Sequence, residues 1–216
     1  MFKNIKHIFF DFDGVILDSV DCKTQAFVSM YSKYGKGIAE KVREYHLLNG
    51  GISRFEKFRY WHKNLLNITL EESEVQEMAN EFSSLVLDNV IKSNEIPGAY
   101  TFIKKNYTNF NLWVITGTPT DEIIVILREL DLCKYFKNVY GSPKKKTFWT
   151  EHIIKSNKLI RDQVLFIGDA MTDYDASVYS KINFTLRSAN YNEKMFNNIN
   201  VFKFKNFKSL QIKLYE

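Results

Sequence analysis

Short apolar runs alternate with polar, turn-forming residues over most of this chain. Runs rich in Ile, Val and Phe at 8–10, 110–118, 138–140 and 163–167 predict buried strands, and 183–186 and 200–202 are weaker candidates. Apolar residues recur every three or four positions at 99–105, 118–130, 147–157 and 173–180, which predicts helices. This alternation predicts an α/β fold, a Rossmann-like parallel sheet with helices on both faces.

The stretch from about residue 20 to residue 94 differs, because it has helical periodicity and no strand period. Glycines at 35, 37, 50 and 51 divide it into short helices, and Thr69–Glu72 predicts a capping box before a long amphipathic helix. We therefore expect a catalytic core of residues 1–18 and 95–216 and a helical cap domain of residues 19–94. Such an insertion, starting just after the first strand, is placed to act as a lid.

Composition restricts the class of protein. The chain has 216 residues, 45% of them hydrophobic, which is ordinary for a globular protein, and its net charge of +5 is compatible with anionic small substrates and with weak nucleic-acid contact. Without a groove-reading motif we expect no nucleic-acid partner, and without an apolar run of about 18 residues no membrane span. Two distant cysteines and the early first strand favour a cytoplasmic protein without a signal peptide, and we expect a monomer or weak homodimer.

Two carboxylates, Asp11 and Asp13, follow the first strand and precede Gly14. Residues i and i+2 of an extended chain project to the same side, so both are expected at one point of the sheet edge where ligands bind in open α/β folds. Two close carboxylates repel each other, so we expect either a cation bound between them or different roles for the two, one as nucleophile and one as acid. An ordinary Asp-Gly turn is the alternative.

Three later strands also end in polar turns, at Thr116-Gly117, at Gly141–Lys146 and at Gly168-Asp169 followed by Asp173. Each turn alone has an ordinary explanation: a strand end, a solvated lysine run or a helix N-cap. Together, in this order and at strand ends, they indicate one shared site.

With these motifs the chain resembles the haloacid dehalogenase-like superfamily of phosphohydrolases, in the branch with a helical cap after the first motif that includes phosphoglycolate phosphatases and beta-phosphoglucomutases. The resemblance covers nearly the whole chain. It implies Mg²⁺ as cofactor, Asp11 as nucleophile forming an aspartyl-phosphate, and Asp13 as general acid and base. It also implies a metal site of Asp11, the Asp13 carbonyl, Asp169 and Asp173.

The resemblance further implies that Thr116, the Gly117 amide and one lysine hold the transferring phosphoryl group. We favour Lys146, with Lys145 and then Lys144 as alternatives. In the predicted cap, the loop from Gly51 to Arg54 resembles the one that faces the substrate, where the Arg54 guanidinium would bind an anionic group. The alternative for Arg54 is an exposed residue at the start of a helix.

Within this superfamily Asp13 excludes two chemistries, because dehalogenases and phosphonate hydrolases lack the second aspartate. We therefore expect a Mg²⁺-dependent phosphatase that hydrolyses a small phosphorylated metabolite, a sugar or small-alcohol phosphate. The alternatives are a sugar phosphomutase on the same core and a non-catalytic binding protein.

Overall fold

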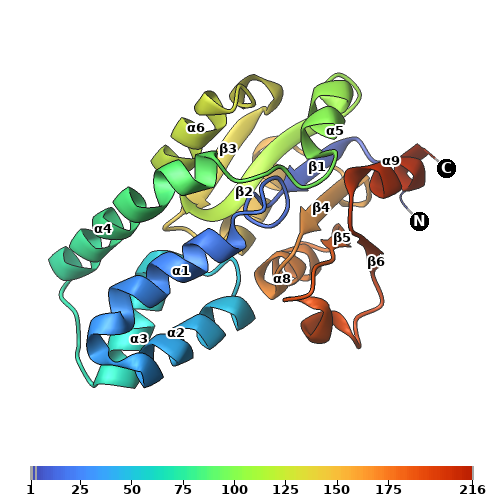
Figure 1. Ribbon diagram of the computed structural model, residues 1–216. Coiled ribbons are helices and arrows are strands. Elements are labelled where there is room, and N and C mark those ends of the chain that lie inside the picture. Colours follow the sequence, from blue (N-terminus) through green and yellow to red (C-terminus); the bar gives the residue numbers. More distant parts are fainter. Residues whose placement is uncertain (1, 3, 216) are drawn as a thin grey trace.

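Six parallel strands form one sheet in the computed structural model, which describes residue 2 and residues 4–215. The strand order is β3-β2-β1-β4-β5-β6, so β1 is flanked by β2 and β4 (Figure 1). The bounds are β1 (His7–Phe10), β2 (Asn111–Pro119), β3 (Asn138–Ser142), β4 (Val164–Gly168), β5 (Asn183–Arg187) and β6 (Phe202–Phe204). The predicted parallel sheet is confirmed, and of the two weaker candidates 183–186 forms β5, whereas the last strand begins two residues later than predicted, at Phe202.

Helices cover both faces of the sheet because the side chains of β1 alternate between them. Ile8 and Phe10 pack in one hydrophobic cluster with residues of α5 (Ala99–Asn106), α6 (Thr120–Glu129) and α9 (Phe207–Tyr215). Phe9 packs in a second cluster with residues of α7 (Lys146–Ser156) and α8 (Met171–Tyr179). The predicted α/β layering is therefore confirmed.

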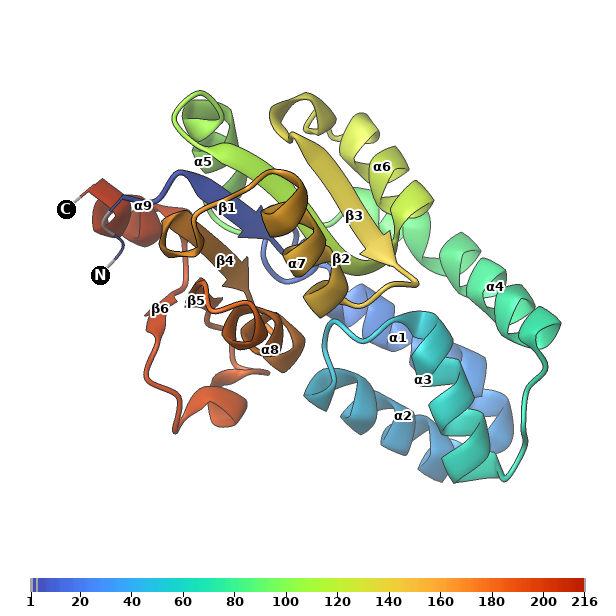
Figure 2. The ribbon, with the colours of Figure 1, turned by 180° about the vertical axis from the view of Figure 1, so that it is seen from behind.

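A helical segment separates β1 from the rest of the sheet in sequence. It contains α1 (Val20–Tyr31), α2 (Lys36–Leu48), α3 (Arg54–Trp61), which continues as a π-helical turn (His62–Leu66), and α4 (Glu72–Ile91). The arrowheads of β1 and β3 point toward this segment, so it lies beside the carboxyl edge of the sheet (Figure 2). We call α1–α4 and their loops the helical segment.

Aromatic side chains form the interior of the helical segment. Phe27 of α1 stacks on Phe82 of α4 with ring centroids 3.9 Å apart and meets Phe58 and Trp61 of α3 edge-on. These residues belong to the same hydrophobic cluster as Phe10 of β1. The helical segment thus packs directly onto one side of the sheet domain.

The predicted capping box at Thr69–Glu72 is wrong by two residues. The long helix α4 begins at Glu72, and the Glu71 backbone N–H donates to the Glu74 carboxylate at 2.8 Å. A glutamate three residues into the helix closes this box, so the start is set by Glu71 and Glu74. No helix in residues 2 and 4–215 is long and apolar enough to cross a membrane.

Candidate active site

The site lies where the carboxyl ends of β1, β2 and β4 meet the helical segment. Asp11 directly follows β1, Thr116 lies in β2, and Asp169 directly follows β4. All three line a cavity of about 70 Å³ that residues of α1, α2 and α3 close from the other side. The parallel sheet thus brings together residues more than 150 positions apart in sequence.

Lys146 is the lysine of the triplet that reaches the carboxylates. Its Nζ lies 2.6 Å from Asp11 Oδ2 and 2.6 Å from Asp173 Oδ1, and all three side chains are buried. Lys144 lies over aromatic rings of α7, and Lys145, 74% exposed, faces away. Burial opposes the charge, but the two carboxylates raise the pKa of Lys146 above its usual value, so it stays an ammonium ion.

Three buried carboxylates form a set that fits a divalent cation. One oxygen each from Asp11, Asp169 and Asp173 lies within 4.8 Å of the others. Burial and the nearby charge of Asp11 raise the pKa of Asp169 to about 7, and burial likewise raises the pKa of Asp173. A hard cation bound by oxygen ligands, such as Mg²⁺, would relieve this mutual repulsion.

Backbone contacts and one tyrosine fix this acidic set. Asp173 Oδ2 accepts hydrogen bonds from the Asp169 and Ala170 amides at 3.2 and 3.1 Å, at the start of α8. Tyr191 donates to Asp169 Oδ2 at 2.5 Å, and Asn192 donates to the Asp169 carbonyl at 2.8 Å. The carboxylates are therefore oriented before any ligand binds.

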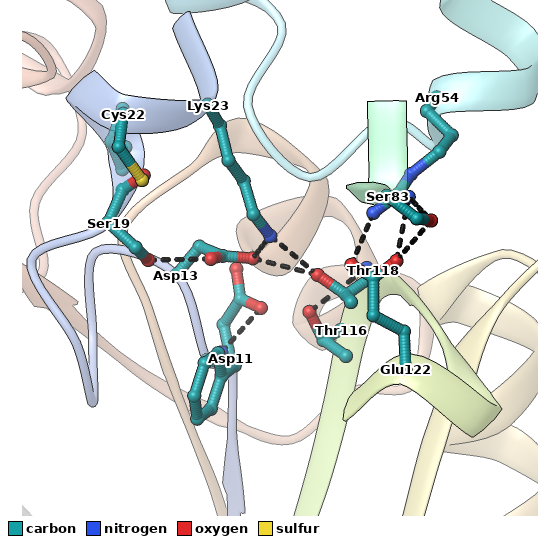
Figure 3. A network of polar contacts seen from close by, with 12 residues as sticks. Asp11, Asp13, Ser19, Cys22, Lys23, Arg54, Ser83, Thr116, Thr118 and Glu122 are labelled. Atoms are coloured by element: carbon teal, nitrogen blue, oxygen red, sulfur yellow. Dashed lines mark hydrogen bonds and ion pairs between the residues drawn. The ribbon is translucent and has the colours of Figure 1, made fainter. Parts of the chain in front are cut away.

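Asp13 has different partners from Asp11. Its Oδ1 accepts from Ser19 at 2.6 Å, and its Oδ2 contacts Lys23 Nζ at 2.5 Å and the Thr118 hydroxyl at 2.9 Å (Figure 3). Burial raises the pKa of Asp13, but the charge and hydrogen bond of Lys23, with those of Ser19 and Thr118, outweigh it, so the net pKa lies below the usual value. In this conformation Asp13 is an ionised carboxylate.

A close backbone contact joins the helical segment to β2. A Cβ added at Gly117 would lie 2.6 Å from the Gly51 carbonyl oxygen, so these two glycines allow the loop to approach the strand. Thr116 beside them is 1% exposed, and its hydroxyl accepts from the Thr118 amide at 3.2 Å. Gly51, Thr116 and Gly117 all line the cavity.

Arg54 bridges the helical segment and the sheet domain. Its two terminal nitrogens donate to Glu122 of α6 at 2.8 and 2.6 Å, and Nη1 also donates to Ser83 at 2.5 Å (Figure 3). The side chain is 4% exposed, so the alternative of a surface arginine is wrong. Its guanidinium borders the cavity with its fork already engaged by a carboxylate.

The structure adds residues that the sequence analysis did not identify. Lys23, Lys57, His46 and Tyr191 all line the cavity. Lys23 lies one helical turn after Ser19, so a cation near Asp13 could have been inferred from helical spacing. The other three depend on how distant segments pack, and no local pattern marks them.

Comparison with known proteins gives the family. The model of the haloacid dehalogenase-like hydrolases matches residues 8–186. Phosphoglycolate phosphatase 1 of Pseudomonas aeruginosa is 25% identical over 193 residues, 86% of this chain and 70% of its own length. The phosphoglycolate phosphatase of Photorhabdus laumondii is 26% identical over 178 residues, 79% of this chain and 75% of its own length.

Solved structures share the fold. A Haemophilus somnus protein assigned by inference as a phosphoglycolate phosphatase has a TM-score of 0.76 at 18% identity and covers 100% of both chains. A Bacteroides vulgatus protein assigned by inference as a beta-phosphoglucomutase has a TM-score of 0.77 at 16% identity, covering 99% of this chain and 91% of its own.

The structure places an acidic centre at the carboxyl edge of a parallel sheet. The chain belongs to the haloacid dehalogenase-like hydrolase family. The resemblance stated from the motifs and the predicted enzyme class, a hydrolase whose named relatives are phosphatases, are confirmed.

Proposed function

We propose that this protein is a Mg²⁺-dependent phosphomonoesterase that hydrolyses a small phosphorylated metabolite through an aspartyl-phosphate. The observation that carries the proposal is the convergence of Asp11, Lys146 and the Asp169–Asp173 pair at one edge of the sheet, where Asp11 and Asp169 also line the cavity. The names of the relatives that match most of the chain support a phosphoric monoester as substrate.

Asp11 is the proposed nucleophile. Its Oδ1 accepts from the Phe12 amide at 2.6 Å and its Oδ2 from Lys146, so the carboxylate is held in one orientation. Attack on phosphorus forms the bond from the Asp11 oxygen and releases the ester oxygen as an alcohol. Lys146, Thr116 and the Gly117 amide are the proposed donors to the phosphoryl oxygens, whose charge must be stabilised during transfer.

Asp13 is the proposed proton-transfer group. It is ionised in the structure, which suits removal of a proton from the water that attacks the aspartyl-phosphate. To protonate the leaving oxygen in the first step it must first take up a proton, and the entering phosphate dianion favours that uptake by repelling a second negative charge.

Asp11, Asp169, Asp173 and the carbonyl of Asp13 are the proposed Mg²⁺ ligands. The cation supplies charge neutralisation between the carboxylates and the phosphoryl oxygens when bound. The helical segment is proposed to act as a cap, because its α1, α2 and α3 close the cavity and the Arg54–Glu122 pair connects it to the sheet domain.

A phosphatase is favoured over a sugar phosphomutase. Both terminal nitrogens of Arg54 already contact Glu122, which reduces the capacity of this guanidinium to hold a distal phosphate of a sugar. The cavity has a volume of only about 70 Å³, which suits a short leaving group better than a hexose. The intact set of acidic and lysine side chains argues against a non-catalytic binding protein.

A phosphoester panel tests the proposal. Purified protein is assayed for free phosphate with and without Mg²⁺, beside Asp11→Asn and the matched control Asp18→Asn, whose side chain is 64% exposed. We expect Mg²⁺-dependent release by the wild type and the control and none by Asp11→Asn. No release from any ester would overturn the proposal, and an isomerised sugar phosphate in place of free phosphate would establish the mutase.

A further inference from the structure

One buried cation of the cavity lacks an acidic partner. Lys57 of α3 is 2% exposed and lines the cavity. Within residues 2 and 4–215 no carboxylate lies within salt-bridge distance of its ammonium group. The other buried cations of the site are each paired with acidic side chains: Lys23 with Asp13, Arg54 with Glu122, and Lys146 with Asp11 and Asp173.

A histidine holds the Lys57 ammonium in place. Lys57 Nζ lies 2.7 Å from Nδ1 of His46 on α2, and the Phe27 ring centroid is 5.7 Å away. Burial and the charge of Lys57 lower the pKa of His46 well below its usual value, so the ring is neutral and Nδ1 accepts the bond. His46 therefore orients the ammonium without neutralising it.

An unneutralised buried ammonium is unfavourable in the free protein. Burial and the charge of Lys23 lower the pKa of Lys57 to about 7. An anion bound beside it would restore the full charge and form a charge-assisted hydrogen bond. The burial of Lys57 and its fixed position beside His46 therefore suit the binding of an anionic ligand.

The cavity connects this ammonium to the reacting centre. Lys57 and His46 line it from the helical segment, and Asp11 and Asp13 line it from the sheet domain. The leaving group of a phosphoryl ester bound at Asp11 would therefore share this cavity with the Lys57 ammonium. The single positive charge beside a neutral imidazole matches a monoanionic carboxylate better than a second phosphate dianion.

We propose that Lys57, oriented by His46, binds a carboxylate on the leaving group, so that the substrates are short phosphomonoesters carrying a carboxylate. This inference rests on the proposed phosphomonoesterase function and adds the substrate class. Lys57 would distinguish these esters from neutral alcohol phosphates of the same size.

A matched substrate pair tests it. The value of kcat/KM is measured for 2-phosphoglycolate and for its isosteric amide, 2-phosphoglycolamide, with wild type, Lys57→Met and the exposed control Lys63→Met. We expect the wild type to prefer the carboxylate at least ten-fold, the preference to fall at least ten-fold in Lys57→Met, and Lys63→Met to keep it within two-fold.

Four results would overturn the inference. The wild type could turn over the amide as well as the acid, or Lys57→Met could keep the wild-type preference. If neutral phosphoesters are hydrolysed and carboxylate esters are not preferred, this inference fails while the proposed function stands. If no phosphoester is hydrolysed, both fail. The wild-type ratio needs no variant, so it decides even if Lys57→Met does not fold.

Discussion

Replacing Lys57 by methionine is predicted to change stability in a pH-dependent manner. Methionine has a similar length and no charge, so Lys57→Met removes a buried ammonium that no carboxylate in the described part of the chain neutralises. Lysine in the unfolded chain has a pKa of 10.5, and burial with the charge of Lys23 lowers that of Lys57 to about 7 in the folded protein. Between these values the unfolded chain binds more protons, so the wild type gains stability as the pH rises.

The magnitude follows from that difference. At pH 7 the lowered pKa of Lys57 destabilises the wild type by about 4 kcal/mol, and at pH 10 by about 1 kcal/mol. Lys57→Met also leaves His46 Nδ1 without its donor, which costs about 1–3 kcal/mol and does not depend on pH above 7, because His46 is neutral there. The variant is therefore expected to be about 2 kcal/mol more stable than the wild type at pH 7 and to lose about 3 kcal/mol of that difference by pH 10.

Urea unfolding at pH 7, 8, 9 and 10 measures this difference, with Lys63→Met as the exposed control. The control is expected to stay within about 0.5 kcal/mol of the wild type throughout. A difference between Lys57→Met and wild type that stays constant from pH 7 to pH 10 would refute the reasoning, because the slope depends only on the lowered pKa of Lys57.

Three further perturbations have defined outcomes. Glu122→Gln leaves Arg54 buried without its carboxylate and should lower the unfolding free energy by about 3–5 kcal/mol in urea denaturation. The double variant Arg54→Met/Glu122→Leu should recover much of that loss. No loss in Glu122→Gln would show that the pair is dispensable. Asp13→Asn should lower kcat about 10²- to 10⁴-fold in steady-state assays with unchanged circular dichroism, and a smaller loss would remove Asp13 from proton transfer. Gly117→Ala should lower both kcat/KM and the melting temperature, because its Cβ would lie 2.6 Å from the Gly51 carbonyl; wild-type values would show that the loop moves freely.

The sheet and its acidic edge were predictable because their signals are local. Apolar runs that end in Asp11, Thr116 and Asp169 mark strands, and parallel strands necessarily end on one edge. Of the lysine triplet, the resemblance favoured Lys146, although no local pattern distinguishes the three lysines that follow β3 and Pro143. In the structure α7 begins at Lys146, whose side chain is buried, whereas the preceding Lys145 is exposed. The position of this helix start therefore determines which lysine reaches the carboxylates.

Contacts between the helical segment and the sheet domain were not predictable. Glu122 lies in the first turn of α6, and it also pairs with Arg54, 68 residues earlier. Lys57 and His46 lie on adjoining helices, and their pairing depends on how α2 packs beside α3. Such pairs arise from tertiary docking, which hydrophobic periodicity does not encode. The C-terminal helix α9, which buries Phe207 and Leu210, was also not predicted.

Phosphorylation of Asp11 is the most direct test of the central claim. The protein is mixed with a turned-over phosphoester carrying a labelled phosphoryl group in the presence of Mg²⁺ and quenched in acid within one turnover, and the labelled peptide is identified by mass spectrometry. We predict an acid-stable, hydroxylamine-labile label on the peptide containing Asp11, absent from Asp11→Asn and present in Asp18→Asn. Label on another residue, or undiminished turnover by Asp11→Asn, would contradict Asp11 as the nucleophile.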